Sequence, residues 1–169
     1  LLLDSPIISH LIQKLETSNE KIKFTRVDAD VVDKLIQKDE KEVSKLNDQE
    51  KEKLKNIVEE TVPKEKYTVQ LEAIDSNSAP FVITLPEFMR RMKEMQQSGG
   101  NGMFGNMPEM YNLIVNVNNP ICSEILNSKS KTKKERLINQ SLDLAKLSQN
   151  LLKGEELTSF IKRSFDLIK

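Results

Sequence analysis

Apolar residues at helical spacing predict most of the elements in the second half of this chain. Asn47 and Glu50 stand in the pattern of a capping box, and Pro63 would end the helix that follows them. Thr84 and Glu87 repeat the capping pattern further along the chain. We therefore expect helices at about 47–62, 84–97, 120–127, 133–152 and 155–168.

Alternation of apolar and polar residues predicts a small sheet. Residues 66–74 read KYTVQLEAI and place Tyr67 and Val69 on one face. Residues 81–84 follow the turn-forming stretch DSNSAP and are expected to return as the hairpin partner of that strand. Residues 111–118, YNLIVNVN, add a third strand whose asparagines fall mostly on the polar face. The fold class is therefore α+β, a three-stranded sheet with helices and a C-terminal helical hairpin.

The beginning of the chain indicates a β-α-β unit. A short apolar run comes first, Pro6 suits the first turn of a helix, and Ile22 and Phe24 mark a second strand. Two strands make no complete sheet, and the chain does not begin with Met, so we interpret it as an excised piece of a longer protein. The predicted organisation is the end of one domain at 1–36, a charged linker at 37–45, and a second domain at 46–169.

The last two helices carry more apolar surface than one copy of the chain is expected to cover. Thr132 and Glu135 form a capping box before the first of them, and Gly154 is expected to stop it. A second copy of the same pair, arranged as a four-helix bundle, would bury the excess. The alternative is that the wide apolar stripe packs on its own sheet. The predicted dimer interface is Leu137, Ile138, Leu144, Ala145, Leu147, Leu151, Leu157, Phe160, Ile161, Phe165 and Ile168.

All six methionines gather in one segment, between residues 89 and 110, beside four of the five glycines. Methionine is unbranched and polarizable, which suits surfaces that fit many shapes, and the glycines predict a flexible loop. The alternative is a helix that covers the sheet with methionine as ordinary core. The predicted apolar binding surface is Phe88, Met89, Met92, Met95, Met103 and Phe104.

Four stretches of the chain resemble one protein family. EFMRRMKEMQQSGGNGMFGNMPEMYNLIVNVN and LAKLSQNLLKGEELTSFIKRS are similar to the C-terminal domain of the bacterial ninety-kilodalton heat-shock chaperones. The opening LLLDSPIISHLIQKLE and the later FTRVDADVVDKLI resemble the end of the middle domain in that family. The methionine–glycine segment and the LLKGEELTSFIKRS ending are the most specific of these motifs.

This resemblance implies both partners and an architecture. In the family, the last two helices of each chain hold two protomers together, and a helix with exposed methionines contacts unfolded or partly folded client proteins. The same roles would fall here on the two surfaces given above. The family binds ATP and Mg²⁺ in upstream domains that no residue here matches. We therefore expect a cytoplasmic homodimer whose present segment has no cofactor and is not an enzyme.

Composition narrows the remaining alternatives. Acidic and basic residues balance at 26 each, which argues against a nucleic-acid partner, and no apolar run is long enough to span a membrane. Cys122 is the only cysteine and His10 the only histidine, so no thiolate metal cluster or catalytic constellation is indicated. Two rival functions are a methionine-rich module that binds signal sequences and a fragment of a nucleotide-binding enzyme. The first lacks a basic RNA-binding helix, and the second lacks a glycine-rich turn after Leu3.

Overall fold

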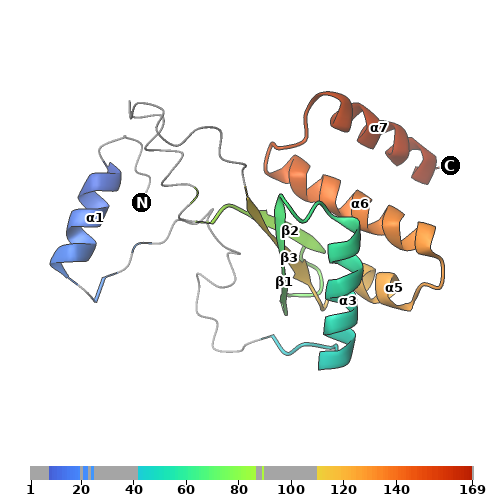
Figure 1. The fold of residues 1–169 in the computed structure, drawn as a ribbon, viewed down its shortest axis with the longest axis horizontal. Helices are drawn as coiled ribbons and strands as arrows, with labels where there is room; N and C mark the ends of the chain where they lie inside the picture. The colour runs from blue at the N-terminus through green and yellow to red at the C-terminus, as the bar shows by residue number, and fades with distance from the viewer. Residues whose placement is uncertain are drawn as a thin grey trace.

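A computed structural model describes residues 8–19, 21–22, 24, 42–86, 89 and 110–168 of the chain. In this part of the chain the fold is α+β, with five helices and one three-stranded sheet (Figure 1). The elements in order are α1 (Ile8–Ser18), α3 (Asp48–Thr61), β1 (Tyr67–Glu72), β2 (Phe81–Thr84), β3 (Tyr111–Asn116), α5 (Pro120–Asn127), α6 (Lys131–Ser148) and α7 (Gly154–Ile168).

The sheet contains the three predicted strands in an order that the sequence pattern did not indicate. β3 lies in the middle, parallel to β1 with Tyr67 opposite Tyr111, and antiparallel to β2 with Phe81 opposite Val115. The predicted hairpin between β1 and β2 is therefore wrong. A strand much later in the chain inserts between them, and the turn-forming residues 75–80 connect two strands that are not neighbours.

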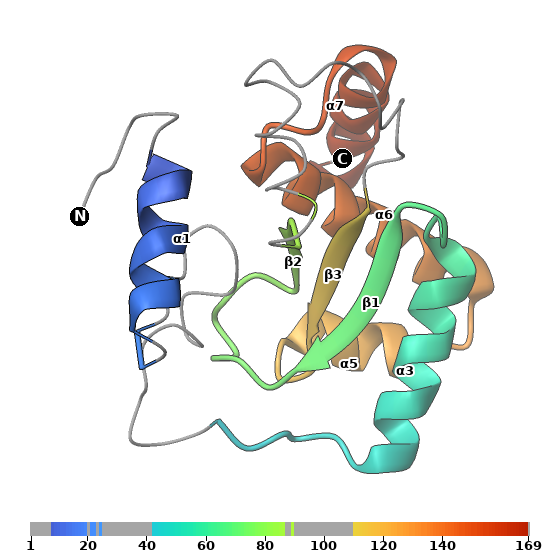
Figure 2. The same cartoon turned by 60° about the vertical axis from the view of Figure 1, so that its left-hand side comes forward.

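Three helices cover one face of the sheet. The inward residues of β1, β2 and β3 share one buried cluster with residues of α3, α5 and α6, and Leu54, Leu113 and Ile138 in it are fully buried. Figure 2 shows these helices on the same side of the strands, with α7 placed beyond α6. Helix α6 therefore lies between the sheet and α7, and its two sides face different surroundings.

The starts of α3 and α5 agree with the sequence prediction, whereas both ends of α6 differ from it. α3 begins at Asn47 with both halves of the capping box, and α5 begins at Asn119, as predicted. α6 begins earlier than predicted because the hydroxyl of Ser130 accepts the amide hydrogen of Lys133, so the Thr132 capping box is wrong. α6 also ends at Ser148, before the predicted end, and Asn150 follows it in the left-handed conformation with φ 56°. Gly154, which was expected to stop α6, is left-handed too, with φ 59°, but it is the first residue of α7.

The N-terminal unit is only partly described. The predicted helix is present as α1, which stands apart from the sheet in both views (Figures 1 and 2). Ile22 and Phe24 are not in a strand, and the apolar run at 1–3 lies outside the described residues, so the β-α-β arrangement is not confirmed. The predicted helix at 84–97 also lies largely outside them, with only Met89 described as helical.

Candidate interaction surface on the C-terminal helices

Polar side chains set α6 and α7 antiparallel. The side-chain amide of Gln140, near the middle of α6, donates to the Ser164 hydroxyl near the end of α7, at 3.1 Å. Lys146, near the end of α6, donates to both carboxylate oxygens of Glu156 near the start of α7, each at 3.1 Å. The contacts advance along α6 from Gln140 to Lys146 while they go back along α7 from Ser164 to Glu156, so the two helices run antiparallel, as in the predicted helical hairpin.

An ion pair between Asp143 and Arg163 joins the middle of the hairpin. Asp143 is buried, and burial raises the pKa of its carboxyl group above the ordinary value, while the charges of Arg163 and Lys146 act in the lowering direction. Nε of Arg163 is buried without a hydrogen-bond partner among the described residues. The side chains of Asp143 and Arg163 are 11% and 41% exposed, so the ion pair is only partly buried, and such a pair fixes the geometry of the hairpin more than it adds stability.

The inner side of the hairpin is closed within one protomer. Ile138 and Ala145 of α6 are 0% and 3% exposed and belong to the core cluster, and Leu137 and Leu151 pack against the same cluster. Phe160 of α7 is 9% exposed. These five of the eleven predicted interface residues already have packing partners within their own chain.

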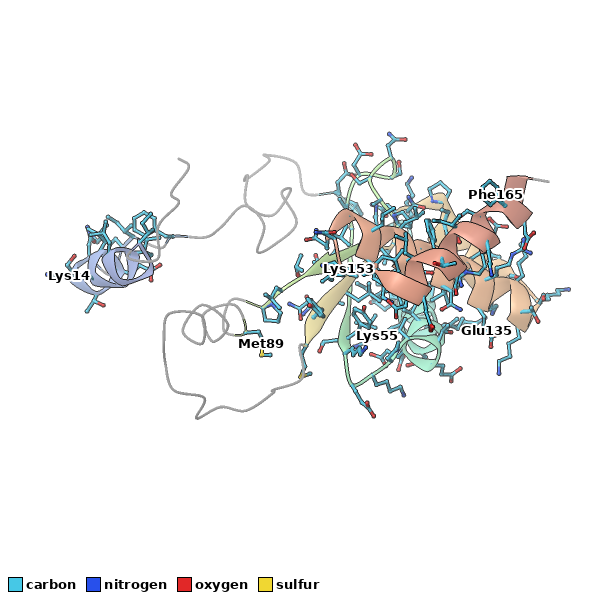
Figure 3. The ribbon with its side chains drawn as sticks, turned by 90° about the horizontal axis from the view of Figure 1, so that it is seen from above. Lys14, Lys55, Met89, Glu135, Lys153 and Phe165 are labelled. Atoms are coloured by element: carbon cyan, nitrogen blue, oxygen red, sulfur yellow. The ribbon has the colours of Figure 1, made fainter. Side chains whose placement is uncertain are left out.

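The outer side of the hairpin is open. Leu144 and Leu147 of α6 are 48% and 45% exposed, and Ile161 and Phe165 of α7 are 45% and 62% exposed. Their spacings of three and four residues place each pair on one face of its helix. Figure 3 shows Phe165 near the C-terminal end of α7, at the rim of the molecule. We call these four residues the outer face; Leu157 is half-buried, and the side chain of Ile168 is not described.

The methionine segment can be located only at its ends. Met89 is half-buried and lies beyond the end of β2, outside the helices of the core (Figure 3). Met110, just before β3, is 42% exposed. Phe88, Met92, Met95, Met103 and Phe104, which complete the predicted binding surface, lie outside the described residues.

Sequence reasoning missed a junction of three buried asparagines where β3 meets α5. Asn116 donates to the carbonyl oxygen of Asp75 at 2.8 Å, and Asn119 donates to that of Ser78 at 2.8 Å. Asn118 bonds to the backbone of the predicted linker. The alternation of YNLIVNVN placed these asparagines mostly on the polar face of the strand and gave them no partner, but an amide that both donates and accepts is well suited to hold passing backbone. The Asn-Asn-Pro sequence at the end of the strand was the available signal.

The remaining candidates for chemistry give no reactive site in the described part of the chain. Cys122 is fully buried, and burial raises the pKa of its thiol to about 12, which keeps it protonated and unreactive near neutral pH. The described residues contain no group of three acidic, histidine or cysteine side chains that could hold a metal ion. None of the described helices combines the length and apolar character needed to cross a membrane.

Comparison with known proteins agrees with the resemblance seen in the motifs. The chain is 30% identical to the chaperone protein HtpG of Bacteroides thetaiotaomicron, over 236 aligned positions that cover 99% of this chain. The chain is homologous to part of HtpG. The HtpG of Porphyromonas gingivalis is 32% identical over 151 positions that cover 87% of this chain. No family model matches the sequence.

The alignment covers nearly all of this chain but only part of HtpG. The chain spans about a third of the length of the Bacteroides relatives, since the alignment covers 35% of the HtpG of B. thetaiotaomicron and the same share of that of B. fragilis. It covers 22% of the relative from P. gingivalis. Nearly all of this chain therefore has a counterpart in HtpG, while most of HtpG has none in this chain.

Proposed function

We propose that this segment pairs two copies of a cytoplasmic, ATP-dependent chaperone and offers client proteins a methionine-rich surface. The pairing would use the outer face of the α6–α7 hairpin, and the ATP would be bound by domains upstream of this segment. The homology to HtpG supports the chaperone assignment. The observation that carries the pairing is the group of four half-exposed apolar side chains on the hairpin.

The outer face is better explained by association than by solvent exposure. Isolated exposed apolar residues are common on protein surfaces, but here two pairs at helical spacing occur on two neighbouring helices. Burying the exposed half of a Leu, Ile or Phe side chain contributes about 1 kcal/mol. A two-fold interface counts each contribution twice, because the same side chain is buried in both copies. The partly buried ion pair between Asp143 and Arg163 holds the two helices at the relative position that a partner would meet.

The pairing is tested by placing a charge on the outer face. We expect Phe165→Glu, and separately Leu144→Glu, to weaken dimerisation at least about a hundredfold, because association would bury an unpaired carboxylate. Sedimentation velocity over a concentration series measures this, with circular dichroism to show unchanged helix content. Asn139→Glu is the matched control, since it adds the same charge to an exposed polar position of α6. Equal sedimentation of both variants and the wild type would exclude the outer face as the interface.

The client surface is tested in the full-length protein. We expect Met92→Ser combined with Met95→Ser to reduce protection of an aggregating client, measured by light scattering, while the dimer stays intact. Met92→Leu with Met95→Leu is the matched control, because it keeps the apolar character and removes only the softness of methionine. The client proposal fails if the serine variant gives the same aggregation curve as the wild type.

A further inference from the structure

The predicted linker is held at one point by a single buried side chain. Asn118 lies between β3 and α5 and is 4% exposed. Its Oδ1 accepts the amide hydrogen of Lys45 at 2.9 Å, and its Nδ2 donates to the carbonyl oxygen of Val43 at 3.2 Å. One amide thus pairs with both a donor and an acceptor of the passing backbone, as a neighbouring β-strand would.

The side chains of the linker do not explain this attachment. Val43 is 82% exposed, and Lys45 is exposed as well. Three residues after Val43, Leu46 packs against the core cluster, and Asn47 then begins α3. Within residues 42–46, the backbone is therefore anchored by Asn118 before the apolar contact that Leu46 makes with the core.

We propose that Asn118 is a positioning residue that fixes where the chain upstream of residue 42 leaves the C-terminal unit. Asn116 in turn holds Asn118 in place. The Oδ1 of Asn116 accepts the amide hydrogen of Asn118 at 3.1 Å, and the Nδ2 of Asn116 donates to the carbonyl oxygen of Asp75. The backbone at Val43 and Lys45 is thereby held by the same junction that begins α5. This role does not depend on dimerisation or on client binding.

Amide hydrogen exchange in the 169-residue chain tests the role of Asn118. In Asn118→Ala we expect the Lys45 amide to exchange at least about tenfold faster, because its acceptor is gone. The amide of Val117, which donates to the carbonyl oxygen of Glu72 at 2.9 Å, reports on the sheet and should change little. Unchanged exchange at Lys45 would overturn the proposal.

If Asn118→Ala also loosens the sheet, a substitution in the linker provides a second test of the proposal. Lys45→Pro removes the amide hydrogen that Asn118 accepts and leaves the core untouched. We expect a lower ¹⁵N–¹H heteronuclear NOE at Val43 and Ser44, with Val117 unchanged. Glu42→Pro is the control, because it places the same ring earlier in the linker and keeps both bonds of Asn118. Equal NOE values in Lys45→Pro, Glu42→Pro and the wild type would overturn the proposal.

Discussion

The two sides of α6 differ sharply although the apolar residues on them are of the same kinds. Toward the sheet, Ile138 and Leu142 are 0% and 5% exposed, whereas on the outer face Leu144 and Leu147 are 48% and 45% exposed. The first pair completes the core of one protomer and the second pair has no such cover in the described part of the chain. A wide apolar stripe can therefore close the core along one side and stay open to solvent along the other within a single chain.

The largest effect on stability is expected when a buried and an exposed apolar residue of α6 are each replaced by glutamate. Ile138→Glu should destabilise the protomer by more than about 4 kcal/mol, because it buries an unpaired charge where the wild type is fully buried. Leu144→Glu, six residues later, should leave the free energy of protomer unfolding nearly unchanged. Urea unfolding at a concentration where both variants are monomeric measures the contrast. Equal destabilisation by the two substitutions would show that the sides of α6 do not differ in this way.

Phe160 of α7 shows the same contrast between buried and exposed apolar residues. The sequence placed it on one apolar face with Ile161 and Phe165, but it is 9% exposed and they are about half exposed or more. Helical spacing identifies which residues share a broad stripe. It does not say which edge of that stripe meets the chain's own core. A charge at position 160 would therefore report on protomer folding as well as on pairing.

A smaller effect on stability is expected from the buried thiol of Cys122 as the pH rises. The pKa of the Cys122 thiol is raised from an ordinary value of 9.0 to about 12, so the unfolded chain releases this proton at lower pH than the folded chain. The contribution to stability is fully present below pH 9 and is lost as the pH rises toward 12. Between pH 8 and pH 10 the loss should be about 1.4 kcal/mol, the free energy of one pH unit beyond the unfolded pKa.

Cys122→Ala provides the comparison for this effect, since other groups also titrate near pH 10. The slope of unfolding free energy against pH should be shallower in the variant than in the wild type. Identical slopes would mean that the thiol is not held protonated by burial.

The smallest expected effect concerns the start of α3. Asn47→Ala removes the side chain that accepts the Glu50 amide hydrogen at 2.9 Å and should lower protomer stability by about 1 kcal/mol. Because α3 covers β1 and lies away from the outer face, the dimer affinity should not change. Thermal unfolding and sedimentation together measure this, and a weakened dimer would contradict the separation of the two regions.

Local signals in the sequence predicted local structure well. The capping box at Asn47, the Asn-Pro start of α5 and the three alternating strands all appear where expected, because each depends on a few neighbouring residues. The strand order could not be predicted in the same way. Pairing of β1 with β3 joins residues about forty positions apart, and no local pattern specifies such a contact.

The candidate sites could likewise be predicted from the sequence only in part. The pattern located the C-terminal hairpin and its excess of apolar residues, but the partition into inner and outer sides needed the three-dimensional packing. The pattern assigned Asn116 and Asn118 to the polar face of the strand but could not predict their junction, because its partners are backbone groups at positions 43–45 and 74–75. Backbone groups leave no mark in the sequence, so only the structure could reveal these bonds.

The central claim is that the outer face of the α6–α7 hairpin joins two copies of the chain. Measurement of the molar mass in solution across a wide range of concentrations tests it most directly. If the outer face joins two copies, the mass should rise from the protomer value of 19.4 kDa to twice that value as the concentration increases, and Phe165→Glu should shift the rise to much higher concentration. A mass of 19.4 kDa at every concentration would contradict it.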